Sequence, residues 1–363
     1  MWASAFFLFT FLLFLLPLLP GVLELRLASD AKPLKVIQEY DTDITYFAVG
    51  FKHYLEKNFA NFFSVQNKAA APFQQGTLGD RTDFQIIRNG KEPFFDKKET
   101  NRSQTSKLII AQPFLELPGG MLFEKEVYSA SSIITGKNSQ FRAILAEENI
   151  TLGEGCTIFR WIHSGASLTV GKGCDLYGRA SAEKIISLGG HCKFERINAP
   201  RILFGHSERS YVDEREVSGL TMLETLSNVK DRYGNRWLVD GDINIPDAHS
   251  FEGDLVASGN IAIGAGSYVK GSLKSNKDLT LGKNARVTGA MVSTGDIHIA
   301  EGCHITGPVV AEGNVLIESG SVIGLENLPT TLSASIITII SGVTVYGTVW
   351  AEERAQMFTG EAA

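Results

Sequence analysis

The chain has few cysteines and no concentrated run of basic residues. Its 363 residues include four cysteines, none of them in a C-x-x-C pair, and this spacing argues against a zinc ribbon or a thioredoxin-like site. A secreted disulfide framework is not expected in so long a chain. The net charge of -6 provides no basic face for a phosphate backbone, so nucleic acid is not an expected partner.

Motifs of common catalytic sites are missing as well. The sequence contains no P-loop, no G-x-S-x-G, no H-E-x-x-H and no paired-carboxylate motif. The histidines are scattered, and none has a recognisable partner for acid–base chemistry. We therefore expect a protein that is not an enzyme, with no catalytic residue, no cofactor and no bound metal.

No charged side chain occurs in residues 1–23, which are rich in Phe and Leu. About 20 apolar residues at 1.5 Å each match the roughly 30 Å thickness of a bilayer core, which predicts a retained, single-pass transmembrane helix. The alternative is a cleaved signal peptide, but no Lys or Arg precedes the run and a poor cleavage site follows it. Because Arg26, Lys32 and Lys35 come after the run, the positive-inside rule places the N-terminus outside and the body in the cytoplasm.

Residues 24–131 are interpreted as a membrane-proximal pre-domain of one helix, short strands and loops. Asp41 and Asp43 offer an N-cap, and apolar residues then recur at helical spacing. These residues are Ile44, Phe47, Phe51, Tyr54, Leu55, Phe59 and Phe62. They predict an amphipathic helix over about 43–64, either packed on the body of the protein or lying on a membrane surface.

A repeat dominates the rest of the chain. Written in rows of 18, the residues from 132 onwards fall into register, with an apolar-x-apolar doublet and a third apolar position in each row. In the second half these core positions are Ile261, Ile263, Val269, Leu279, Leu281, Val287, Ile297, Ile299 and Ile305. The register predicts a first block at 132–204, an excursion or hinge at 205–239, a second block at 240–351 and a tail at 352–363.

The row predicts an all-β solenoid. Alternating apolar and polar residues form short strands with one face inward, and Gly, Asp and Asn clusters form the corners between them. Three strands and three corners make one coil, and successive coils stack in parallel about 4.8 Å apart. One coil buries too little apolar surface to offset the backbone entropy of its residues, so only the stack is stable.

Two features of the row have structural interpretations. Cys156, Cys174, Cys192 and Cys303 share one row position with Ser267, Ala285 and Ser321, which predicts a small inward residue at a tight corner. The coils at the ends of a stack expose unpaired strand edges, which favour pairing with another copy. The candidate residues for this self-association are Ile133, Ile134, Phe141, Ile337, Ile339, Val343 and Val345.

Rows such as SGNIAIGAGSYVKGSLKSNKDLTLGKNARVTGAMVSTGDIHIAEGCHITGPVV resemble those of bactofilins, the polymer-forming bacterial cytoskeletal proteins. The resemblance covers residues 241–324 and, more loosely, 150–203. It implies a right-handed parallel β-helix that polymerises end to end without nucleotide, at the inner membrane of a bacterium. The implied partners are further copies of the chain, inner-membrane lipid and unknown client proteins, and the implied role is a cytoskeletal or positioning scaffold.

Two alternatives stay open at this point. A hexapeptide-repeat acyl or nucleotidyl transferase shares the period, since 18 is three times six, but the third six-step position here is small and polar, as at Ser275 and Ser293. An exported surface solenoid would need a cleaved signal peptide or the opposite membrane orientation.

Overall fold

The computed structural model describes residues 2, 6, 9, 10, 44–60, 73–88, 104–112, 114–205, 229–233 and 235–360. The chain divides into two compact units, Met1–Asp43 and Ile44–Ala363. In the first unit, four residues within 1–10 are described and are helical, so the predicted transmembrane segment at 1–23 falls mainly outside the described residues. Within the described part of the chain, no helix is both long enough and apolar enough to cross a membrane.

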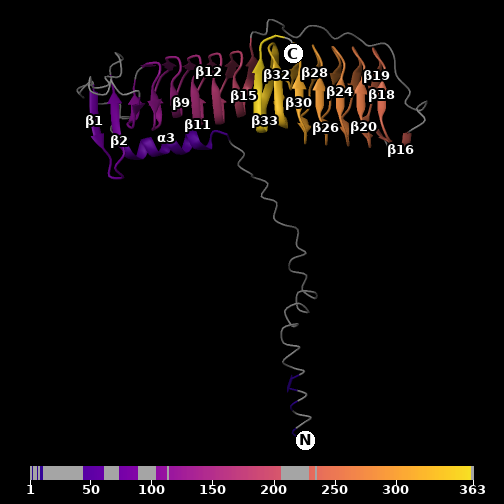
Figure 1. Cartoon of the computed structure of the whole chain (residues 1–363), viewed down its shortest axis with the longest axis horizontal. Coiled ribbons are helices and arrows are strands. Elements are labelled where there is room, and N and C mark those ends of the chain that lie inside the picture. The colour runs from indigo at the N-terminus through magenta and orange to yellow at the C-terminus, as the bar shows by residue number, and fades with distance from the viewer. Residues whose placement is uncertain are drawn as a thin grey trace. The chain divides into compact units, whose positions relative to one another are not determined.

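The second unit is a β-solenoid of about 12 turns, built from two stacks of strands (Figure 1). The first stack comprises β1 (Phe73–Thr77), β2 (Asp83–Ile87), β3 (Gln104–Thr105), β4 (Leu108–Ala111), β5 (Leu115–Leu117), β6 (Leu122–Phe123), β7 (Val127–Ser129), β8 (Ile133–Thr135), β9 (Gln140–Ala146), β10 (Ile150–Leu152), β11 (Thr157–Ser164), β12 (Ser167–Val170), β13 (Asp175–Ala182), β14 (Ile185–Leu188) and β15 (Lys193–Phe204). Each strand pairs in parallel with the strand one coil away, except for the antiparallel hairpin of β1 and β2.

The second stack has the same plan. It comprises β16 (Val229–Tyr233), β17 (Arg236–Val239), β18 (Ile243–Ile245), β19 (Ser250–Glu252), β20 (Asp254–Ala257), β21 (Ile261–Ile263), β22 (Tyr268–Lys270), β23 (Leu273–Ser275), β24 (Leu279–Leu281), β25 (Arg286–Val287), β26 (Met291–Ser293), β27 (Ile297–Ile299), β28 (His304–Ile305), β29 (Val309–Ala311), β30 (Val315–Ile317), β31 (Val322–Ile323), β32 (Thr330–Ile340) and β33 (Val343–Phe358). It also begins with an antiparallel hairpin, here of β16 and β17.

The predicted core positions of the second stack are confirmed. Ile261 pairs with Leu279 and Leu279 with Ile297, one directly above the other. All nine predicted core side chains are buried. The middle residue of each doublet points outward, and at Thr280 it is exposed. The coils therefore stack as the period predicts, because parallel pairing one row apart superposes equivalent side chains.

Three predicted boundaries were wrong. The first stack begins well before residue 132, since β4 pairs with β7 and β5 with β8. The predicted tail at 352–363 is strand as far as Phe358. Part of the predicted excursion at 205–239 belongs to the solenoid, because β17 pairs in parallel with β20. Residues 206–228 of this segment lie outside the described residues.

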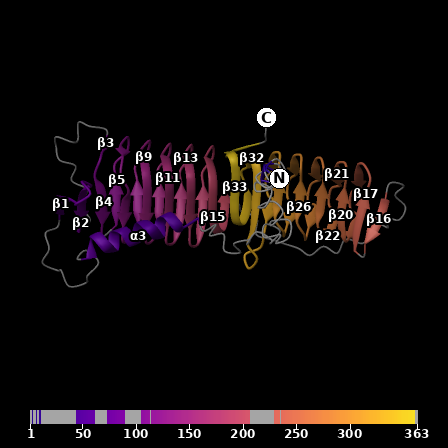
Figure 2. The ribbon, with the colours of Figure 1, turned by 90° about the horizontal axis from the view of Figure 1, so that it is seen from below.

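One helix of the second unit, α3 (Tyr46–Asn58), lies along the first stack (Figure 2). It falls inside the predicted range of 43–64 and packs on the body of the protein. Leu55 is fully buried among outward-facing side chains of the stack, which include Leu108, Tyr128 and Trp161. Thirteen residues at 1.5 Å each make a helix of about 20 Å, which spans about four coils at 4.8 Å. The helix thus supplies a second apolar layer outside one face of the solenoid.

One corner of each coil uses a left-handed backbone conformation. The residues in this column are Asn138, Gly155, Gly173, His191, Ala248, Gly266, Asn284, Gly302 and Gly320, all with φ between 55° and 73°. Gly and Asn adopt this conformation readily, which explains most of the column. Except at His249, the residue that follows is buried in the core, and this is the position of the cysteines.

Candidate functional site

The two stacks meet at a seam formed by their last strands. β15 of the first stack runs antiparallel to β33 of the second and pairs with it along nearly its whole length. The pairs fall in three groups, one on each face of the solenoid: Phe194 with Ala355, Ile197 with Val349, and Phe204 with Val343. All three faces therefore continue from one stack into the other, in reversed strand direction.

The core is also continuous through the seam. The buried side chains of both stacks, from Ile87 to Met357, form a single apolar cluster. Main-chain hydrogen bonds cross the seam from Gly342 N to Phe204 O at 2.7 Å and from Met357 N to Cys192 O at 3.0 Å. The last coil of each stack therefore has no open edge, because the other stack provides its neighbour.

The residues predicted to form free end coils lie elsewhere. Ile133 has a parallel partner on each side, Leu115 and Ile150, so β8 is internal. The same is true of Ile134, Phe141, Ile337 and Ile339, which all have partners on both neighbouring strands. Val343 and Val345 do occupy a last coil, but they pair with Phe204 and Ile202 across the seam. The prediction that these seven residues form free ends was therefore wrong.

The outer ends of the unit are the first coils of the two stacks. At the second stack, β18 and β19 pair with β21 and β22, and the described residues provide no partner on their other side. At the first stack, β3 and β5 likewise pair with β6 and β8 alone among the described strands. The apolar side chains here, such as Leu115 and Phe251, are already buried. Among the described residues, these ends therefore present main-chain edges without a strand partner, and they expose little apolar surface.

The cysteine column has a hydrogen-bonding role. The thiols of Cys156, Cys174, Cys192 and Cys303 donate to Gly136 O, Gly153 O, Gly171 O and Gly282 O at 3.1–3.2 Å. Ser267 and Ser321 make the same bond to Pro246 O and Ala300 O. A small donor at this corner thus satisfies a carbonyl of the preceding coil. Burial raises the pKa of the Cys303 thiol to about 12, which suits a structural role rather than a nucleophilic one.

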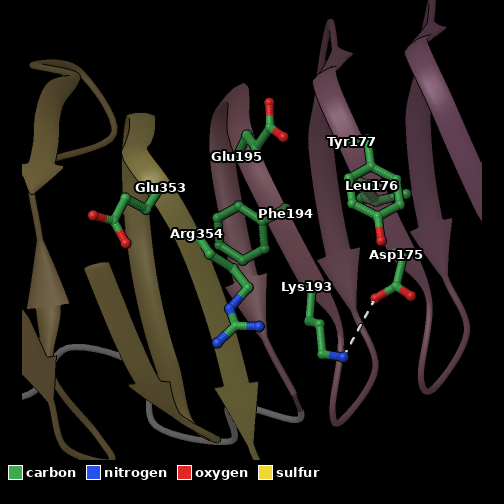
Figure 3. A pocket seen from close by; sticks show the side chains of 8 residues that line it. All are labelled: Asp175, Leu176, Tyr177, Lys193, Phe194, Glu195, Glu353 and Arg354. Carbon is green, nitrogen blue, oxygen red and sulfur yellow. Dashed lines mark ion pairs between the residues drawn. The ribbon is translucent and has the colours of Figure 1, made fainter. Parts of the chain in front are cut away.

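A shallow pocket of about 130 Å³ lies at the seam (Figure 3). It is lined by Asp175, Leu176, Tyr177, Lys193, Phe194, Glu195, Glu353 and Arg354, from β13, β15 and β33. The pairing of β15 with β33 shifts register between Phe194 and Arg196, beside this pocket. Lys193 Nζ lies 3.9 Å from Asp175 Oδ1, and Gly178 N donates to Glu195 Oε2 at 3.1 Å. The lining offers ion pairing but contains no serine, cysteine or histidine.

Of the described histidines, His53 lies on α3, and the others lie at outward or corner positions of the solenoid. His163 Nδ1 lies 2.8 Å from Ser181 Oγ, and His298 Nε2 lies 2.9 Å from Glu318 Oε1. Burial, and then the charge of Arg286, lower the pKa of His304. Within the described ranges, no group of three or more His, Cys, Asp or Glu side chains could hold a metal ion.

The chain matches no protein-family model, no curated protein and no solved structure. The resemblance of its rows to those of bactofilins thus stays a prediction from residue pattern.

Sequence reasoning missed two features of this site. The early coils carry a usable signal, because Leu115-Glu-Leu117 stands 18 residues before Ile133-Ile-Thr135 and shows the same alternation. The seam carries no comparable signal. Its strands belong to rows of ordinary composition, and antiparallel pairing between distant rows leaves no period in the sequence.

Proposed function

We propose that this protein is a non-enzymatic scaffold: a rigid solenoid, tethered to a bacterial inner membrane by its N-terminal segment, whose copies join through their outer ends. The observation that carries this proposal is the seam. There, the terminal coils of two stacks pair edge to edge on all three faces and share one core. An assembly of separate copies requires the same kind of contact between terminal coils.

The outer ends have the groups that such a contact uses. In β18, Ile243 N donates to Asn260 O of the next coil. Since successive residues of a strand direct their main-chain groups to opposite sides, those of Asn244 face away from the stack. In β5, Leu115 N donates to Ser132 O, so the groups of Glu116 face outward in the same way. Open edges of this kind pair with other strands.

The strength of the contact follows from its composition. Because apolar side chains at both ends are already buried, association adds main-chain hydrogen bonds and little apolar area. We therefore expect assembly that depends on protein concentration rather than an obligate complex. Tethering to a membrane raises the local concentration of copies and favours the assembled form.

Other parts of the proposal rest on the sequence pattern. The apolar run at 1–23 supports a membrane tether with the body in the cytoplasm. The preference of parallel crossover connections for one hand supports a right-handed coil. The long faces of the solenoid offer regularly spaced side chains to client proteins, as in other repeat proteins.

Proline at the free edge tests the proposal. Asn244→Pro and Glu116→Pro remove an outward N–H and leave the hydrogen bonds to the next coil in place. The matched controls Asn244→Ala and Glu116→Ala change the same side chains and keep the N–H. Mass measurement by light scattering over a range of concentrations, with electron microscopy, reports the assembly of the full chain in detergent.

We expect the wild type and both alanine variants to form end-to-end chains and both proline variants to remain single copies with an unchanged melting temperature. A wild type that stays monomeric at every concentration would rule out assembly through the ends. Equal assembly of the proline variants would place the contact elsewhere.

A further inference from the structure

A row of basic and aromatic side chains crosses the seam on the face that α3 partly covers. Trp161, Arg179, Arg196 and Trp350 are register partners on the consecutive strands β11, β13, β15 and β33. Register partners point to the same side of a sheet, so the four side chains share one outer surface. Trp161 lies under α3, and Trp350 is 45% exposed. The row thus emerges from beneath the helix and ends at the surface.

Aromatic rings hold both guanidinium groups. Cζ of Arg179 lies 4.7 Å from the ring centroid of Phe47, in the first turn of α3. Cζ of Arg196 lies 4.3 Å from the ring centroid of Trp350. A guanidinium that stacks on an aromatic ring keeps its N–H groups in its own plane, where they remain available to an anion.

Neither arginine is neutralised by the part of the chain that the structure describes. Other cations of the first stack have carboxylate partners, as in Arg142 with Glu126 at 2.8 Å and Lys52 with Glu147 at 2.7 Å. No such pair involves Arg179 or Arg196 among the described residues. In addition, Nε of Arg196 is buried and lacks a hydrogen-bond partner.

Two adjacent cations without a counter-charge are an unfavourable arrangement. Burial, and then the charge of Arg179, lower the pKa of Arg196. A bound anion would offset the repulsion between the two guanidinium groups.

We propose that Arg179 and Arg196, held by Phe47 and Trp350, bind a phosphate group. A carboxylate satisfies the N–H groups of one guanidinium, whereas a tetrahedral phosphate monoester presents oxygens to two and carries enough charge for both. The same group occurs in soluble phosphate compounds and in the headgroup of phosphatidic acid. This inference stands independently of assembly through the outer ends.

The test uses the full chain and follows the fluorescence of Trp350, which the variant Trp350→Phe identifies among the tryptophans. In one arm, protein in detergent is titrated with inorganic phosphate, with sodium chloride of equal ionic strength as the reference for screening. In the other arm, the protein is placed in bilayers of phosphatidylcholine with and without phosphatidic acid. The binding variant is the double substitution Arg179→Gln and Arg196→Gln. The control is Lys172→Gln with Arg201→Gln, which removes the same charge from exposed positions of the same stack.

We expect a saturable change in Trp350 fluorescence. The control variant should keep the affinity of the wild type, and the binding variant should lower that affinity by roughly tenfold or more per arginine. Saturation by inorganic phosphate would identify a soluble phosphate ligand, and a response to phosphatidic acid alone would identify a lipid headgroup. The proposal is overturned if neither arm saturates, or if the binding variant and the control respond alike. Equal melting temperatures of the two variants show that both are folded.

Discussion

Thr348 donates a hydrogen bond from its hydroxyl to Asn198 Oδ1 at 3.0 Å, although 150 residues separate the two in the chain. The bond lies on the outside of the seam, where the second stack has returned to meet the first. Beneath it, Ile197 and Val349 pair in the core. Polar partners thus lie on the outside of the seam and apolar partners inside it, where one continuous core joins the two stacks.

A charge placed in the seam should separate the stacks. Val349 is fully buried and lies between Ile197 and Leu332. We expect Val349→Asp to lower the free energy of unfolding by about 3 kcal/mol or more, since a buried carboxylate there has no partner. Val310→Asp, on an outward position of the same face with 37% exposure, should change it by about 0.5 kcal/mol or less. Denaturant unfolding measures both, and equal effects would contradict the packed seam.

The corner cysteine should accept serine but not valine. Cys303→Ser keeps the hydrogen bond to Gly282 O, as Ser267 and Ser321 do at the same position, so we expect a small change in stability. Cys303→Val leaves that carbonyl without its donor and should cost about 1–3 kcal/mol. Because burial raises the pKa of this thiol to about 12, a thiol reagent at neutral pH should label it only after unfolding. Rapid labelling of the folded chain would contradict this environment.

Stability should fall in acid partly through His304. Its folded pKa is lowered by burial and then by Arg286, so the unfolded chain takes up a proton at higher pH than the folded one. This contribution is fully present above the unfolded pKa of about 6.5 and is lost as the pH falls below it. His304→Gln should therefore flatten the pH dependence of the melting temperature between about pH 7 and pH 5. His53→Gln, at an exposed position, is the matched control.

A substitution on α3 should detach the helix from the stack only if it removes a buried side chain. Leu55 is fully buried against the stack, whereas Val49 on the same helix is 60% exposed. We expect Leu55→Ala to cost about 2–4 kcal/mol and to raise hydrogen exchange in α3, while Val49→Ala costs less than about 0.5 kcal/mol. Exchange measured by mass spectrometry distinguishes this from a loss of stability that is spread over the whole solenoid.

The predicted positions were most reliable where the repeat is regular. Leu279, Leu281 and Val287 were assigned to the core from spacing alone, and the parallel pairs place them there. The end coils were assigned poorly. Ile133 starts the clear part of the repeat in the sequence, but weaker coils precede it in the structure. A boundary read from a repeat marks where its pattern becomes clear, and the stack can continue through coils of less regular composition.

The sequence by itself determined the coil: its length, its inward columns and the small residue at each tight corner. This is possible because residues one row apart are neighbours in space, so the contacts of the core repeat at a fixed interval along the chain. Only the tertiary structure decided that the two stacks meet at their last coils, that α3 covers one face, and that Arg196 lies against Trp350. These contacts join segments that share no period, and their formation depends on the shapes of surfaces that exist only after the coils have stacked.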